Sequence, residues 1–282
     1  MLVKMEKFPL FLTPNMREKT RRVIFFPRKK NSISVCVQKT NLFLSLPLID
    51  QARIQLKEEW INIMDNSNYT EDIKQMLLLE NKFILKLIDS KKYKRIIEIG
   101  CGFGENAFDF AMHYSEIEYI GMDVNHQYIS KAKLMAEFKD IKNLHFNKLA
   151  ANEIEKIFSK LNDLKEKKTL IYFPFNILGN ITNINETILK IYEYECDFII
   201  FTYQQNEKAN QERQIYYTNC GFKLEFKENL FFSCFSSSNG FVSKVYKKIF
   251  MDELLKDETK SYNKFEECLG SIGYIYLMEK KH

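Results

Sequence analysis

Short apolar runs alternate with longer segments of helical period through the middle of this chain. The runs are RIIEI (95–99), EYIGMD (118–123), LHFNKL (144–149), TLIYFPF (169–175) and DFIIFTY (197–203). Helix-like segments lie between and after them, at roughly 104–114, 126–139, 152–163, 183–194 and 207–219. Apolar strands that alternate with helices indicate parallel strands covered on both faces. The pattern predicts an α/β fold with an open, mostly parallel sheet and helices on both of its faces.

The pattern changes after residue 222. FKLEFKENLFFSCFS (222–236) and FVSKVYKKI (241–249) are rich in strand formers, FMDELLKDE (250–258) has the pattern of a short helix, and GYIYLMEKK (273–281) ends the chain as a strand. Successive strands without long helices between them predict antiparallel pairing at one edge of the sheet.

The first 90 residues differ from the rest of the chain. Short β-like runs, RRVIFF (21–26), SISVCVQ (32–38) and LFLSLPL (42–48), precede helix-like segments at about 49–64 and 70–89. Thr70, followed by Glu71 and Asp72, has the pattern of a helix N-cap. We therefore expect three regions: a small β-rich accessory element at 1–48, helices at 49–90 that pack on the core and can form a substrate lid, and the α/β domain at 91–282.

Composition narrows the class of protein. Hydrophobic residues make up 45% of the 282 residues and include 24 Phe and 15 Tyr, enough for a packed core. No apolar run approaches the roughly 18–20 residues that span a bilayer, and the N-terminus lacks the apolar stretch of a signal peptide. We expect a cytoplasmic protein without a membrane partner.

The distribution of charges, cysteines and histidines does not favour a nucleic-acid partner or a bound metal. The net charge of +5 is interleaved with 37 acidic residues, so a nucleic-acid partner is not favoured over a small one. The six cysteines are scattered without a C-x-x-C pair, and the four histidines do not fall at ligand spacings. We expect no metal site and a structural role for His113, His126 and His145. The sequence does not indicate an oligomeric state.

Three glycines fall at alternate positions in EIGCGFGEN (98–106), between an apolar run and a helix-like segment. A strand that enters such a loop brings backbone N–H groups and a helix N-terminus against a ligand. The dinucleotide fingerprint needs a third glycine at 105, where Glu105 would repel a pyrophosphate, and a P-loop lysine is absent.

EIGCGFG resembles the first motif, (D/E)-x-G-x-G-x-G, of the class I S-adenosylmethionine-dependent methyltransferases, and the resemblance covers about residues 70–280. The family resemblance implies a seven-stranded sheet, S-adenosyl-L-methionine as the methyl donor and S-adenosyl-L-homocysteine as the product. It places Glu98 near the methionyl ammonium and the three glycines beneath the cofactor. Asp123, about 20 residues further on, matches the carboxylate that binds both ribose hydroxyls.

The remaining cofactor positions follow from the same resemblance. Met122 would contact the adenine, and the loop KLAANE (148–153) offers Ala150, Ala151 and Asn152 for the adenine edge, without the family's usual Asp. The complete predicted set is Glu98, Gly100, Cys101, Gly102, Gly104, Asn106, Met122, Asp123, Ala151, Asn152 and Phe173.

Substrate-facing candidates lie after the fourth and fifth apolar runs. FPFN (173–176) loosely resembles the (D/N/S)-P-P-(Y/F) tetrad of amino-methylating enzymes, but the order differs and no Pro-Pro pair is present. Asn176 and Tyr203 are the predicted catalytic residues, with Asn180 beside them. The alternative is that the aromatic residues are core and that Asn180 follows Gly179 in a turn.

Three functional hypotheses follow. The first is a methyltransferase acting on an amine or hydroxyl of a small molecule or peptide. The second is an RNA or DNA methyltransferase that docks nucleic acid through the basic turn with Arg28, Lys29 and Lys30. The third is a non-catalytic binding subunit with the same fold, against which the intact glycine motif argues.

Overall fold

The computed structural model describes residues 63, 65–163, 167–257 and 259–281. They belong to the second of two units into which the chain divides, Gln51–His282. The β-rich element predicted at 1–48 and the helix predicted at 49–64 therefore lie outside the described residues, apart from residue 63.

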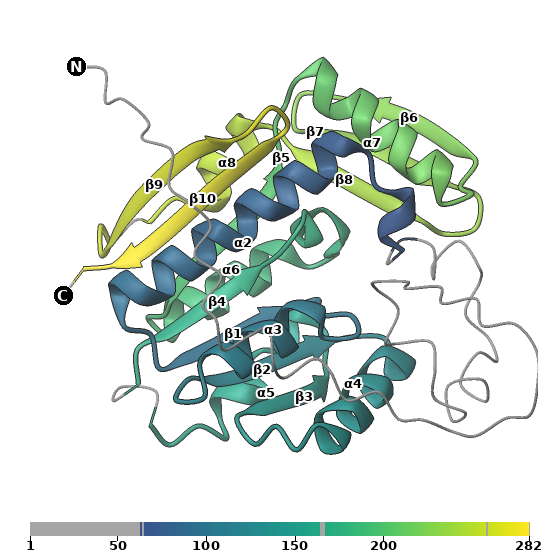
Figure 1. Cartoon of the computed structure of the whole chain (residues 1–282). Helices are drawn as coiled ribbons and strands as arrows, with labels where there is room; N and C mark the ends of the chain where they lie inside the picture. Colours follow the sequence, from purple (N-terminus) through teal and green to yellow (C-terminus); the bar gives the residue numbers. More distant parts are fainter. Residues whose placement is uncertain (1–62, 64, 164–166, 258, 282) are drawn as a thin grey trace, which may run out of the picture. The chain divides into compact units, whose positions relative to one another are not determined.

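Seven strands form the main sheet, in the order β3-β2-β1-β4-β5-β10-β9 (Figure 1). β1 to β5 pair in parallel, whereas β10 runs antiparallel between β5 and β9. This confirms the predicted open, mostly parallel seven-stranded α/β sheet. The strands are β1 (Arg95–Ile99), β2 (Glu118–Asp123), β3 (Leu144–Lys148), β4 (Thr169–Phe173), β5 (Asp197–Tyr203), β9 (Tyr262–Leu269) and β10 (Gly273–Lys280).

Helices cover both faces of this sheet. On one face, the side chains of β1, β2 and β4 meet α2 and α3, as in the contacts of Tyr172 with Glu80 and Phe110. On the other, Ile97, Ile171 and Ile200 pack in an apolar cluster with α5, α6 and α8. The helices are η4 (Asn66–Asn68), α2 (Glu71–Lys91), α3 (Glu105–His113), α4 (His126–Phe138), η5 (Ala151–Glu153), α5 (Glu155–Phe158), η6 (Ile177–Asn180), α6 (Ile184–Glu193), α7 (Glu207–Asn219) and α8 (Lys248–Leu254).

Local signals in the sequence explain where these helices begin. The Thr70 hydroxyl accepts a hydrogen bond from Ile73 N and caps α2, as predicted. The helix predicted at 152–163 is shorter, since only residues 155–158 form α5, with Ile157 and Phe158 buried. The chain then leads to Asp163, whose carboxylate pairs with Arg95 on the sheet.

The segment after α7 departs from the prediction. Its strands do not extend the edge of the main sheet but form a separate antiparallel sheet, which we call the appended sheet: β6 (Leu224–Glu228), β7 (Phe232–Ser237) and β8 (Val242–Tyr246). The edge position belongs instead to β9, which the sequence analysis did not predict. Six of the eight β9 side chains are not buried, so its sequence YNKFEECL lacks the apolar signal of a core strand.

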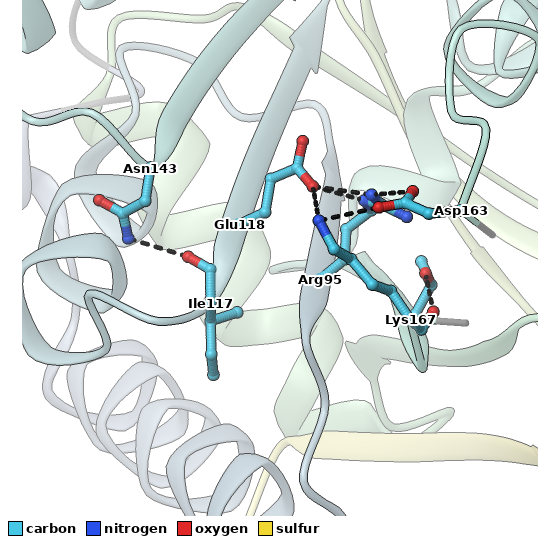
Figure 2. A network of polar contacts seen from close by, with 7 residues as sticks. Arg95, Ile117, Glu118, Asn143, Asp163 and Lys167 are labelled. Carbon is cyan, nitrogen blue, oxygen red and sulfur yellow. Dashed lines mark hydrogen bonds and ion pairs between the residues drawn. The ribbon is translucent and has the colours of Figure 1, made fainter. Parts of the chain in front are cut away.

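A network of charged side chains lies where β1 and β2 begin, at the amino end of the sheet (Figure 2). The buried Arg95 guanidinium donates to Glu118 Oε2 at 2.7 and 2.9 Å and to Asp163 Oδ1 at 2.6 Å. Lys167 pairs with the same two carboxylates, and hydrogen bonds from Lys167 and Arg95 lower the pKa of Asp163 to about 2. The network ties β1, β2 and the chain before β4 together at the amino end of the sheet.

Replacing Glu118 with glutamine should lower the free energy of unfolding by about 1 kcal/mol, because the amide keeps the shape but not the charge that faces Arg95. Chemical denaturation measures the change, with Glu116→Gln, an exposed neighbour, as the control. An equal effect of the two substitutions would contradict a role of this network in stability.

Candidate functional site

The glycine loop follows β1 and adopts a conformation that favours glycine. Gly100, Gly102 and Gly104 have φ values of +73°, +54° and +85°, in the left-handed region. The amides of Gly100 and Cys101 donate to the carbonyl oxygen of Met122 at 2.7 and 3.1 Å, which fastens the loop to the end of β2. Gly104 then serves as the N-cap position of α3. The loop therefore passes over the carboxyl ends of β1 and β2.

Two of these glycines are also required by close packing. A Cβ atom on Gly100 would lie 2.2 Å from Ile177 Cγ1, and one on Gly104 would lie 2.5 Å from Phe146 Cζ. Ile177 is the first residue of η6, which follows β4. The glycine loop is thus in direct contact with the segment that follows β4.

Asp123 ends β2 beside the glycine loop. Its Oδ2 accepts from Gly102 N at 3.0 Å and its Oδ1 accepts from Asn125 N at 2.8 Å. Each oxygen keeps further acceptor capacity, and burial raises the pKa of this carboxyl above its usual value. Val124 follows with 65% of its side chain exposed, an apolar surface that the sequence analysis missed.

Glu98 lies beneath the loop rather than at its surface. It is buried, its Oε1 accepts from Asn106 Nδ2 at 3.0 Å, and its Oε2 accepts from the Tyr119 hydroxyl at 2.9 Å. Burial, with smaller contributions from Asp123 and Glu105, raises its pKa to about 7. A positive charge placed over the loop would favour the ionised form of Glu98.

The predicted adenine contacts are buried to different extents. Met122, Ala151 and Phe173 share one apolar cluster, and Phe173 is fully buried within it. Asn152 Nδ2 donates to Glu186 Oε2 at 3.0 Å, so its amide is held by α6. Cys101 is also buried. Of the predicted cofactor set, the structure brings together the glycine loop, Glu98, Asn106, Met122 and Asp123 most closely.

The segment after β4 carries the predicted catalytic Asn176. The oxygen of its amide accepts from Thr202 Oγ1 at 2.7 Å, and its Nδ2 donates to Lys244 O at 3.0 Å and Ser243 Oγ at 3.3 Å. Every polar atom of this side chain therefore has a partner within the protein. The geometry gives Asn176 a structural role in joining β4, β5 and β8.

Tyr203, the other predicted catalytic residue, is buried in an aromatic cluster with Tyr69, Phe175 and Tyr216. The ring of Phe175 lies 6.1, 5.7 and 5.9 Å from those of Tyr69, Tyr203 and Tyr216. Tyr69 and Phe175 are half-buried, whereas Tyr203 and Tyr216 are buried. Of these four rings, those of Tyr69 and Phe175 are partly accessible, and a substrate contact by Tyr203 stays a prediction.

The predicted structural histidines lie at exposed positions of the described chain. His113 and His145 are exposed at the end of α3 and within β3, and His126 Nδ1 lies 3.5 Å from Ser130 Oγ on α4. Within the described part of the chain, no group of three or more His, Cys, Asp or Glu residues is arranged to hold a metal ion. No helix there is both long and apolar enough to cross a membrane.

A family match covers the glycine loop and the parallel strands of the sheet. Residues 90–229, which include the glycine loop, Asp123 and β1 to β5, match the family described as "Methyltransferase domain". Residues 90–229 of this chain form a methyltransferase domain. S-adenosylmethionine is the cofactor of this family.

Individual proteins that resemble this chain share limited sequence identity with it. The tRNA (guanine-N(7)-)-methyltransferase of Prochlorococcus marinus (strain AS9601) is 31% identical over 90 residues, 32% of this chain and 43% of that protein. The match thus spans less than half the length of this curated relative. A crystal structure of a protein from Pyrococcus horikoshii OT3 aligns with a TM-score of 0.53 and 16% identity, covering 80% of this chain and all of that one. A SAM-dependent methyltransferase from Aquifex aeolicus aligns with a TM-score of 0.51 and 12% identity, covering 79% and 98% of the two chains.

The residues of the methyltransferase domain fit this cofactor. Asp123 offers two carboxylate oxygens for a vicinal diol, and the exposed Val124 offers an apolar surface for an adenine. Glu98, when ionised, would supply a negative charge suited to a cationic group of the cofactor. Gly100 and Gly104 leave room for Ile177 and Phe146 and allow the left-handed backbone that places the loop beside Asp123.

The raised pKa of Glu98 predicts a pH dependence of cofactor affinity. From pH 7 to pH 5.5 the affinity for S-adenosylmethionine should fall about tenfold, because a Glu98 with a pKa of about 7 must lose its proton to face a cation. The amino group of the cofactor stays protonated throughout this range. Calorimetric titration measures the slope, which should be nearly absent in Glu98→Gln. A wild-type affinity that does not change with pH would contradict the role of Glu98.

Proposed function

We propose that this protein transfers the methyl group of S-adenosylmethionine to an amine or hydroxyl group of a small molecule or peptide. The observation that carries the proposal is the glycine loop, with Glu98 below it and Asp123 beside it, in contact with the segment after β4 through Gly100 and Ile177. Methyl transfer requires a site for the donor beside a surface that can hold the acceptor in line with it.

The bound cofactor supplies an electrophilic methyl group on a sulfonium. The chain's own residues hold the donor and orient the acceptor, because proximity and in-line geometry alone can supply roughly 7–11 kcal/mol of the rate enhancement. The aromatic faces of Tyr69 and Phe175 favour an acceptor that is aromatic or cationic. The acceptor group itself must be neutral when it attacks, so we expect the reaction to accelerate with pH through the pKa of an amine substrate.

A second candidate function is methylation of RNA, which two observations favour. The relative from Prochlorococcus marinus is named as a tRNA methyltransferase. In addition, residues 1–62 contain 12 basic and 5 acidic residues, a net charge of +7, whereas residues 63–282 contain 30 and 32, a net charge of −2. The excess positive charge is therefore concentrated before the methyltransferase domain, where it can bind phosphates.

The test begins with calorimetric titration of the full chain with S-adenosylmethionine and S-adenosylhomocysteine. Binding supports the proposed function, and no binding of either at about 100 µM, a concentration that detects affinities down to about −5 kcal/mol, contradicts it. Transfer of labelled methyl groups is then measured with a panel of amines, hydroxyl compounds and peptides and, separately, with total tRNA.

The variant Arg28→Ala/Lys29→Ala/Lys30→Ala separates the two substrate classes. If RNA is the substrate, transfer to tRNA should depend steeply on salt and fall in this variant, because phosphate contacts release counterions. If a small molecule is the substrate, its methylation should be unchanged. Cofactor binding without transfer to any acceptor would favour a non-catalytic subunit.

A further inference from the structure

The segment after β4 has an unusual backbone. Phe175 and Asn176, two consecutive residues that are not glycine, have φ values of +32° and +57°. Bulky residues rarely adopt such values, and strained backbone persists only where the surrounding structure holds it. The strain lies at the carboxyl edge of β4, next to the glycine loop.

One side of this segment is held by β5 and the appended sheet. Asn176 N donates to Phe201 O at 2.9 Å, and its side chain reaches Thr202 and Lys244. Gly179 lies so close to β8 that a Cβ atom there would be 1.9 Å from Lys244 O. These contacts fix Asn176 and η6, but they leave the amide of Phe175 to another partner.

That partner is Glu80, in the middle of α2. Only 2% of Glu80 is exposed, and both of its carboxylate oxygens lie 3.3 Å from Phe175 N. The Tyr172 hydroxyl donates to Glu80 Oε1, so the carboxylate is oriented from β4 as well. Burial raises the pKa of Glu80 to about 8, a sign that the group lies in an environment that disfavours its charge.

Burying the Glu80 carboxyl costs folding free energy, and its hydrogen bonds indicate which part of the site it holds in place. Glu80 accepts hydrogen bonds from the backbone amide of Phe175. The ring of Phe175 is half-buried in the aromatic cluster beside the glycine loop. Holding this amide keeps Phe175 in its left-handed conformation and so sets where its ring lies.

We infer that Glu80 is a positioning residue, which holds Phe175 so that its ring forms the wall of the site against the sulfonium methyl group. This inference rests on the proposed function and adds the residue that arranges the methyl-transfer side of the site. An aromatic face attracts a cation, and S-adenosylmethionine carries a sulfonium that S-adenosylhomocysteine lacks. Glu80 therefore acts on the preference for the first ligand over the second, through Phe175.

The experiment compares the affinities of the full chain for S-adenosylmethionine and S-adenosylhomocysteine by calorimetry, in wild type and in Glu80→Ala, Glu80→Gln and Phe175→Leu. Glu80→Ala and Phe175→Leu should each lower the affinity for S-adenosylmethionine about fivefold, within the range of cation–π interactions, and that for S-adenosylhomocysteine less than twofold. The double variant Glu80→Ala/Phe175→Leu should bind S-adenosylmethionine no more weakly than either single variant, because both changes remove the same contact.

Two controls separate positioning from other effects. Glu80→Gln keeps an acceptor for Phe175 N and should retain most of the wild-type preference, whereas an effect of the Glu80 charge alone would be lost in both variants. Ile84→Ala, which opens a cavity on the same buried face of α2, should lower stability without changing the preference.

The outcomes are distinct. Equal weakening of both ligands in Glu80→Ala, loss of the preference in Glu80→Gln, or the same loss in Ile84→Ala would each overturn the inference. Wild-type protein that binds neither ligand would overturn the proposed function itself. Binding of both ligands with a preference that no Glu80 variant alters would overturn the role of Glu80 alone.

Discussion

Replacing Asp123 with alanine is expected to weaken the binding of S-adenosylmethionine and S-adenosylhomocysteine about 100-fold or more. The reason is the loss of two charge-assisted hydrogen bonds to the ribose hydroxyls, each of which contributes roughly 1.5–3 kcal/mol. Both carboxylate oxygens are already oriented by backbone amides, those of Gly102 and Asn125, so the site needs little rearrangement to bind a diol.

Calorimetry measures this loss, and two further variants make it specific. Asp123→Asn keeps one acceptor and should lose at least tenfold but less than Asp123→Ala, since one bond is lost and the other becomes a neutral one. Asp109→Ala, an exposed aspartate on α3, should bind as wild type does. Chemical denaturation shows whether Asp123→Ala remains folded. An affinity within threefold of wild type in the folded variant would contradict the ribose assignment.

Replacing Gly100 with alanine is expected to lower the free energy of unfolding by about 2–5 kcal/mol and to abolish detectable cofactor binding. A left-handed backbone costs an L-residue roughly 1–2 kcal/mol, and overpacking adds about 1–3 kcal/mol. Both apply here, because Gly100 has a φ of +73° and its new Cβ would overlap Ile177 Cγ1 at 2.2 Å.

Two further variants separate the backbone cost of Gly100→Ala from its overpacking cost. Gly240→Ala has a similar φ of +94° but nothing within 4 Å of the new Cβ, so it reports the backbone cost alone. Gly100→Ala/Ile177→Ala removes the overlapping side chain and should recover the overpacking part, apart from the cost of the cavity at Ile177. Chemical denaturation measures all of them. A Gly100→Ala variant as stable as Gly240→Ala would show that the loop and η6 do not pack as described.

The central sheet could be predicted because its strands are buried on both faces. RIIEI and DFIIFTY are buried at every position, so their apolar runs stand out from the helices between them. The edge is different. β9 exposes charged side chains such as Lys264 and Glu267, and only its pairing with β10 makes it a strand. Nothing local in the segment after α7 distinguishes an appended sheet from an extension of the main one.

The sequence by itself determined the glycine loop and the carboxylate beside it. Glycines that need a left-handed backbone, and a carboxylate at the end of the next strand, depend on local geometry and on the parallel order of β1 and β2. Only the tertiary structure decided the surroundings of the segment after β4. Asn176 is a core amide and Glu80, 95 residues before Phe175, holds that residue's backbone. Contacts between residues so far apart depend on how α2 and β8 pack against β4, and no pattern along the chain records that packing.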